Sequence, residues 1–246
     1  MNLILGNIVD NVHAKKVIKN LDKYILKAKE AQPFNAATVI SACDKLSSKL
    51  SEDDIKLLID MGVPQYKAEQ EFKLLKLMLS KEYLEKRLKR ELGEGTFYEY
   101  EEEYKPYGYD VKVRHKFVPL GTLFHISAGN VELLAAFSII EGLLTGNINI
   151  VKLASSDDGL SVMLLKKLID IEPLLKSFIF VFDIVSDDIK TLKKISRLSD
   201  AIVVWGSDEA IRASRTFAGI NTRIIEWGHK ISFAYVSYNA KIEDIP

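Results

Sequence analysis

The stretch "GTLFHISAGNVELLAAFSIIEGLLTGNINIVKL", residues 121–153, holds a strand, a helix and a second strand in immediate succession. Residues 121–127 and 148–154 are strand-like, while residues 131–144 carry apolar side chains at helical spacing, with Gly146 placed to end the helix. The turn after the first strand has neither a G-x-G-x-x-G fingerprint nor a Walker lysine. The stretch therefore predicts a parallel strand-helix-strand unit whose ligand must be inferred from other residues.

The same alternation continues along the rest of the chain. Further helices are predicted over residues 157–171, 186–198 and 208–219, and further strands over residues 177–182, 201–207, 222–227 and 231–237. Repeated alternation of this kind indicates a parallel sheet with helices on both faces. We therefore predict an α/β fold, a Rossmann-like doubly wound and mainly parallel sheet over residues 119–246.

The preceding part of the chain has a different character. Residues 1–94 show helical periodicity and predict a helical region, in which residues 66–93 form one long charged helix. Cys43 lies on an apolar helical stripe and is expected to be buried. Residues 95–118 alternate at period two around a Lys-Pro-Tyr-Gly turn, which predicts a β-ribbon able to pair with another subunit. We therefore expect a homo-oligomer.

Composition excludes several classes of function. The 246 residues include 34 basic and 34 acidic side chains, so no net charge is available to attract nucleic acid or anionic lipid. The most apolar stretch, residues 131–153, is interrupted by charged and small polar residues, which argues against a membrane span. A single cysteine excludes an internal disulfide framework. We expect a cytoplasmic protein that binds neither nucleic acid nor membrane.

Polar residues follow the first two predicted strands of the sheet, at the end where parallel sheets bind ligands. Ser127 ends the first strand, and Asn130 either caps the next helix with its side-chain oxygen or presents its amide NH2 as a donor. Lys152 follows on the second strand. It is either a surface lysine of an edge strand or a cation placed to meet a phosphate or ribose.

Two further positions follow the later strands. Gly206 lets a ligand approach the backbone closely, and Ser207 can cap a helix whose N-terminal NH groups attract anions, although a tight turn alone also explains the pair. Glu226, in an apolar run, is either a general base or a paired structural acid. The four histidines show no metal-ligand spacing, so we predict no metal site, and His115 and His125 are expected to be ordinary strand residues.

These candidates fall within four runs, "PLGTLFHISAGNVE", "GLLTGNINIVKLASSD", "SDAIVVWGSDEAIR" and "RIIEWGHKISFAYV", which cover residues 119–236 in order. Together the runs resemble the amino-terminal half of the LuxC-like acyl-CoA reductase (fatty acid reductase) family, a branch of the aldehyde dehydrogenase superfamily. The resemblance implies that Asn130 holds an oxyanion and that Glu226 corresponds to the superfamily's general base. It places the other candidates at the cofactor: Ser127, Lys152, Ser155, Gly206, Ser207 and Gly228.

The sequence departs from the family pattern in two ways. The superfamily's Gly-rich turn after the third strand is replaced here by "FDIVSDD", which leaves that part of the cofactor wall without a counterpart. The family's nucleophilic cysteine lies a few tens of residues beyond the Glu226 motif, whereas this sequence stops at Pro246. We therefore expect a chain truncated before its catalytic domain and inactive by itself.

The resemblance implies NADPH-dependent reduction of a long-chain acyl thioester, acyl-CoA or acyl-carrier, to the aldehyde through a cysteine acyl-enzyme. NADPH is favoured because Ser155 stands where NAD-preferring members of the superfamily place a carboxylate. One alternative is NAD-linked aldehyde oxidation, in which Glu226 activates water. Another is a non-catalytic nucleotide-binding or assembly subunit.

Overall fold

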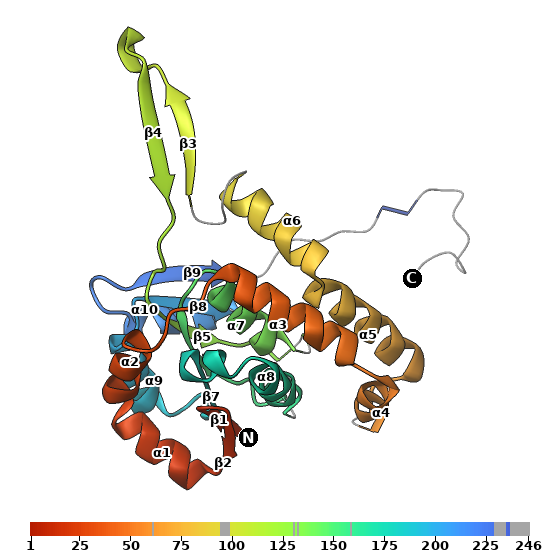
Figure 1. The fold of residues 1–246 in the computed structure, drawn as a ribbon. Helices are drawn as coiled ribbons and strands as arrows, with labels where there is room; N and C mark the ends of the chain where they lie inside the picture. The colour runs from red at the N-terminus through yellow and green to blue at the C-terminus, as the bar shows by residue number, and fades with distance from the viewer. Residues whose placement is uncertain are drawn as a thin grey trace.

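A seven-stranded sheet organises the chain in the computed structural model, which describes residues 1–60, 62–93, 99–129, 131, 133–157, 159–228 and 235–236. Its strand order is β2-β1-β7-β6-β5-β8-β9 (Figure 1). The strands are β1 (Asn2–Ile4), β2 (Asn7–Val9), β5 (Thr122–Ile126), β6 (Ile148–Lys152), β7 (Ile179–Phe182), β8 (Ala201–Trp205) and β9 (Arg223–Trp227). Strands β5 to β9 pair in parallel, which confirms the predicted doubly wound, mainly parallel sheet.

Helices cover both faces of this sheet (Figure 1). The helices are α1 (Asn11–Lys19), α2 (Leu21–Lys29), α3 (Ala36–Lys49), α4 (Glu52–Asp60), α5 (Gln65–Leu79), α6 (Lys81–Leu92), α7 (Leu134–Leu144), α8 (Leu160–Ile171), α9 (Ile189–Arg197) and α10 (Asp208–Phe217). Helices α7 and α8 lie on one face under α3, while α9 and α10 lie on the other, with α1 beside α9. Short 3-10 helices span Pro106–Gly108 and Pro173–Phe178.

The order of the strands places a switch point between β5 and β8. From β5 the chain moves outward to β6 and then β7, and it returns to place β8 on the other side of β5. The crossover helices on either side of this point therefore lie on opposite faces. Open sheets of this kind bind ligands at the carboxyl ends of the strands that flank the switch point.

Two features of the first 94 residues differ from the prediction. The expectation of an entirely helical region is wrong for residues 2–9, which form β1 and β2 and extend the sheet from β7 in antiparallel fashion. The predicted single helix over residues 66–93 is also wrong, because it divides at Ser80. That residue has extended backbone angles, and its Oγ accepts a hydrogen bond from Tyr83 N, so it caps the second helix.

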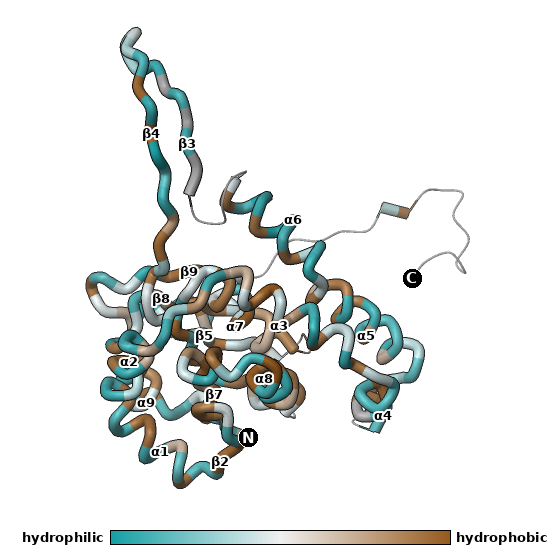
Figure 2. Tube along the Cα trace, viewed as in Figure 1, coloured by the Kyte–Doolittle hydropathy of each residue, from teal (hydrophilic) through white to brown (hydrophobic). Residues whose placement is uncertain are grey.

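The predicted ribbon is present as an antiparallel pair, β3 (Glu99–Tyr104) and β4 (Val111–Lys116). It projects away from the sheet, and Tyr107 at its tip is fully exposed (Figure 1). Figure 2 shows that the ribbon is mainly hydrophilic, whereas hydrophobic residues gather in the sheet and the helices that cover it. Its pairing with another subunit stays a prediction.

Cys43 lies in α3 with no exposed surface, as its helical stripe predicted. Burial, assisted by the nearby charge of Asp44, raises the pKa of the Cys43 thiol to about 12. A thiol with this pKa carries almost no thiolate at neutral pH, so Cys43 is a packing residue. Among the described helices none has the length and apolar character needed to span a bilayer.

Candidate functional site

The turns after β5 and β6 are tied together at the carboxyl edge of the sheet. Ser127 N donates to Lys152 O at 3.2 Å, and Ser156 Oγ donates to Gly129 O at 3.0 Å. A Cβ added at Gly129 would collide with Ser156 Oγ, so a larger residue there would displace this hydroxyl from its hydrogen bond. Ser127 itself is nearly buried, and its hydroxyl donates to the next carbonyl. Asn130, the predicted oxyanion residue, lies outside the described residues.

Lys152 is the last residue of β6, in the centre of the sheet, so the alternative of a surface lysine on an edge strand is wrong. The residue is only 6% exposed, and its Nζ donates to Ser186 Oγ at 2.9 Å. Desolvation lowers the pKa of the Lys152 ammonium, and the negative charge of Asp183 partly opposes that effect. No ion pair in the described part of the chain includes Lys152. A partly desolvated cation with one neutral partner is suited to binding an anion.

Ser155 lies three residues after Lys152 in the turn that follows β6, and its side chain is exposed. The loop after β7 supplies Ser186 and therefore lies against the same end of β6. A groove of about 1170 Å³ runs from this loop between α1 and α9. Six basic and three acidic side chains line it. The groove therefore carries an excess of positive charge, although the charges of the whole chain balance.

Gly206 and Ser207 form the turn between β8 and α10, on the other side of the switch point from Ser127. Gly206 has a φ of 153°, and its N–H donates to Trp227 O at 3.2 Å, which joins the ends of β8 and β9. Ser207 Oγ accepts from Ala210 N and caps α10, so the predicted capping role of Ser207 is confirmed. The first turn of α10 thus opens onto the carboxyl edge of the sheet.

Glu226 lies within β9 and faces α10, where it forms an ion pair with Arg215. Arg215 Nε donates to Glu226 Oε1 at 2.7 Å, and Nη2 donates to Oε2 at 2.9 Å. Both carboxylate oxygens are therefore engaged, which favours the paired structural acid of the two alternatives. Gly228 follows the strand, where a Cβ would lie 2.9 Å from Ile211 Cδ1. Residues 229–234, which include the remainder of the predicted Glu-Trp-Gly-His-Lys motif, lie outside the described residues.

A buried polar cluster beneath this edge was not predicted from the sequence. His125 Nδ1 lies 2.7 Å from Ser138 Oγ, and His125 Nε2 lies 3.1 Å from Asn149 Oδ1. Trp205 Nε1 donates to the same Ser138 Oγ at 3.2 Å. The available signal was the presence of polar residues in strands and a helix that are otherwise apolar, because such residues require hydrogen-bond partners when buried.

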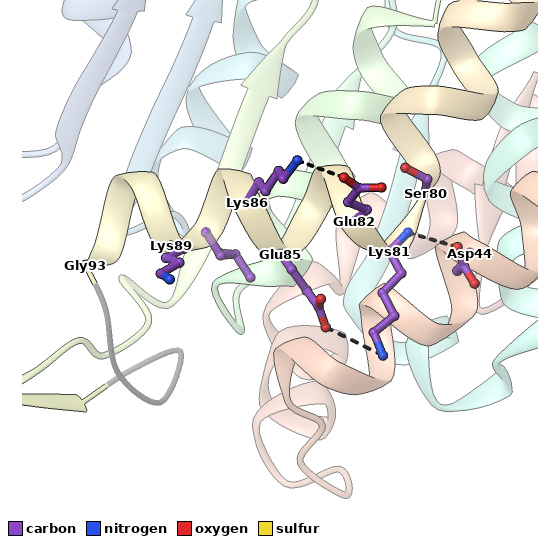
Figure 3. A pocket seen from close by; sticks show the side chains of 9 residues that line it. Asp44, Ser80, Lys81, Glu82, Glu85, Lys86, Lys89 and Gly93 are labelled. Carbon is purple, nitrogen blue, oxygen red and sulfur yellow. Dashed lines mark hydrogen bonds and ion pairs between the residues drawn. The ribbon is translucent and has the colours of Figure 1, made fainter.

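A second hollow, of about 730 Å³, lies beside α6 and away from the strand ends (Figure 3). Its charged groups pair with one another: Lys81 Nζ lies 3.8 Å from Glu85 Oε1, and Lys86 Nζ lies 2.7 Å from Glu82 Oε1. Asp44 Oδ1 accepts a hydrogen bond from the backbone N–H of Lys81. These groups are already satisfied, so the hollow shows no chemistry of its own. In the part of the chain that the structure describes, no cluster of His, Cys, Asp and Glu is suited to hold a metal ion.

Comparison with known proteins gives a match over most of the chain. A family model described as acyl-CoA reductase (LuxC) matches residues 32–245. The chain is 32% identical over 124 residues to long-chain acyl-protein thioester reductase 2 of Photobacterium leiognathi, which covers 49% of this chain and 26% of the relative. It is 30% identical over 128 residues to the long-chain acyl-protein thioester reductase of Aliivibrio fischeri, covering 51% and 27%. The matches thus span about a quarter of each curated relative.

Solved structures share the fold at low identity. An NAD-dependent benzaldehyde dehydrogenase from Corynebacterium glutamicum aligns with a TM-score of 0.64 and 18% identity, over 85% of this chain and 46% of that one. Glyceraldehyde-3-phosphate dehydrogenase GapN from Methanocaldococcus jannaschii, complexed with NADP, aligns with the same TM-score and identity, over 91% and 47%. At this identity the likeness establishes an aldehyde dehydrogenase-like α/β fold and nothing about the ligand.

Proposed function

Because the chain belongs to the acyl-CoA reductase (LuxC) family, we propose that it forms the cofactor-binding part of an enzyme that reduces a long-chain acyl thioester to the aldehyde. The names of the relatives in Photobacterium leiognathi and Aliivibrio fischeri support a protein-bound acyl donor, and the family description supports acyl-CoA. Both donors present the same thioester carbonyl to the enzyme.

The proposed cofactor is NADPH, which supplies a hydride when bound. The observation that carries this assignment is Lys152, a largely buried ammonium at the carboxyl end of the central strand, hydrogen-bonded to one neutral hydroxyl. Lys152 would hold the phosphorylated adenosine ribose together with the exposed hydroxyl of Ser155. Gly206 and the N-terminus of α10 behind Ser207 would hold the pyrophosphate, since the backbone NH groups of a helix N-terminus favour anions.

Reduction through an acyl-enzyme requires a thiolate that displaces the donor thiol from the acyl carbon. Cys43 is the chain's single cysteine, and its burial in α3 and raised pKa make it unsuitable. On this proposal the nucleophile comes from outside these 246 residues. Asn130 would donate its amide NH2 to the thioester oxygen, which gains negative charge when sulfur attacks.

Thioester reduction and aldehyde oxidation require different roles of Glu226. Oxidation of an aldehyde to an acid needs a base that activates water, whereas thioester reduction releases the aldehyde without hydrolysis. The two-point pairing of Glu226 with Arg215 supports a structural role for this carboxylate, and it therefore favours reduction over NAD-linked aldehyde oxidation.

Titration of NADPH into Lys152→Ala tests the cofactor assignment. Loss of one charge-assisted hydrogen bond, worth about 1.5–3 kcal/mol, should weaken binding about tenfold to a hundredfold. Lys56→Ala is the matched control because Lys56 is an exposed lysine of α4 that pairs with Asp53 one turn away. Equal affinities in wild type and Lys152→Ala would refute the assignment.

Ser155 tests the preference for the 2'-phosphate separately. Ser155→Asp introduces a carboxylate that would repel the 2'-phosphate of NADPH. The affinity for NADPH should therefore fall relative to that for NADH by about tenfold or more. Ser155→Ala removes only the hydroxyl and should cause the smaller change. An unaltered NADPH-to-NADH ratio in Ser155→Asp would remove Ser155 from the site.

A further inference from the structure

Trp205 and Trp227 form a stacked pair at the carboxyl edge of the sheet. They end neighbouring strands, lie opposite each other in the register of β8 and β9, and have ring centroids 4.9 Å apart with planes 9° apart. Trp227 is 44% exposed. The chain contains only these two tryptophans, so its indole signals report on this pair alone.

A directed series of hydrogen bonds reaches Trp205 from the core. Asn149 Nδ2 donates to Asn147 O at 2.8 Å, which leaves Asn149 Oδ1 as the acceptor facing His125 Nε2. Nε2 must therefore carry the hydrogen, and His125 Nδ1 accepts from the hydroxyl of Ser138. The same Ser138 oxygen accepts from Trp205 Nε1. Each donor thus has one acceptor, and the sequence of bonds has a single direction.

The residues that form this series of hydrogen bonds come from rigid parts of the fold. His125 lies in β5, Asn149 in β6 and Ser138 in α7, and all three side chains are buried. Burial lowers the pKa of His125 to about 4, so its ring stays neutral and keeps the tautomer that the bonds require. Leaving one of these buried polar groups without a hydrogen-bond partner would cost free energy, so the hydrogen-bonded arrangement is strongly favoured.

We propose that the Asn149–His125–Ser138 chain is a positioning device that fixes the Trp205 indole, so that Trp205 and Trp227 form a rigid aromatic wall for the nicotinamide ring. The wall stands beside the Gly206 turn at the strand ends, where a planar ring can lie against the exposed part of an indole. Oxidised nicotinamide is cationic, and indole is the best of the aromatic faces for cations. The identity of the ring rests on the proposed function; the fixing of Trp205 does not.

Far-UV circular dichroism of the 246-residue chain reports on the wall, because two close indoles held at a fixed, non-parallel angle of their transition dipoles give an exciton couplet that weakens when either ring becomes mobile. Ser138→Ala should lower the couplet by at least about half, since it removes the one hydrogen-bond acceptor that Trp205 Nε1 has among the described residues. Trp227→Phe defines zero couplet, and Ser138→Thr, which keeps the hydroxyl, should restore most of it. The matched control is Ser161→Ala in α8, where a buried hydroxyl with no partner among the described residues is removed. A full couplet in a folded Ser138→Ala chain would overturn the proposal.

Titrations with NADP+ and with 2',5'-ADP, which lacks the nicotinamide, test the ring contact. Ser138→Ala should weaken NADP+ on the order of fivefold and leave 2',5'-ADP within about twofold of wild type. Equal weakening of both ligands would overturn the ring contact. If the wild-type chain binds NADP+ no more tightly than 2',5'-ADP, the ring contact is also overturned. If the wild-type chain binds neither ligand, the proposed function is refuted.

Discussion

Mild acid should destabilise the chain through His125. The folded-state pKa of this histidine is about 4, against an ordinary value of 6.5, because burial disfavours the charged ring. Well above pH 6.5 the ring is neutral in both the folded and the unfolded state, so it does not change the free energy of unfolding. As the pH falls from 6.5 toward 4, only the unfolded chain takes up the proton, so the free energy of unfolding decreases. One pH unit corresponds to about 1.4 kcal/mol per proton, so the loss is about 2 kcal/mol between pH 7 and 5 and about 3 kcal/mol below pH 4.

Urea denaturation at several pH values in this window measures the effect. His125→Gln cannot take up a proton, so its stability should fall less with acid than that of wild type, and the two profiles should differ in slope by about 1 kcal/mol per pH unit. His13→Gln, at an exposed position of α1, is the control and should follow the wild-type profile. Parallel profiles for wild type and His125→Gln would contradict the assignment of a neutral, buried His125.

Three other substitutions or treatments have defined outcomes. Cys43 should resist alkylation by iodoacetamide in the native chain and react after unfolding, as intact mass would show; rapid native labelling would contradict its burial. Gly121→Ala should destabilise by about 2 kcal/mol or more in urea melts, because φ is 121° and the new Cβ would collide with Asp200; Gly62→Ala, strained at 93° but with no neighbour within 4 Å, should cost less. Ser80→Ala should cost about 1 kcal/mol through loss of the α6 cap, and an unchanged melting temperature would argue against that cap.

The core of the fold was predictable because it depends on local pattern. Residues 121–227 alternate between period-two and helical spacing, and the sheet, its helices and the glycine and serine turns follow directly. Strands β1 and β2 were missed because each has three residues and because β1 pairs with a strand far along the sequence. The helix break at Ser80 was missed because charged residues continue on both sides of it, although a serine followed by a charged turn is a capping signal.

The site was predictable in position more than in chemistry. Lys152 and the Gly206 turn lie at the carboxyl edge as the pattern indicated, because strand ends in a parallel sheet converge there. The partners of these residues depend on contacts between distant segments. Arg215 on α10 pairs with Glu226 on β9. Ser138 joins His125 to Trp205, and although a polar residue in an apolar helix indicates a buried hydrogen bond, the sequence does not say which partners it has.

The antiparallel pairing of β1 with β7 also constrains the order of folding. Asn2 Oδ1 accepts a hydrogen bond from Asp183 N, 181 residues further along the chain. At a synthesis rate of about 5–20 residues per second, residues 2–4 leave the ribosome on the order of ten seconds before that partner exists. Leu3 and Ile4, both buried in the finished sheet, can pair with β2 during that interval but not with β7. Contacts of such large sequence separation are slow to form, so this edge of the sheet should close last and should be the segment that a nascent-chain chaperone binds.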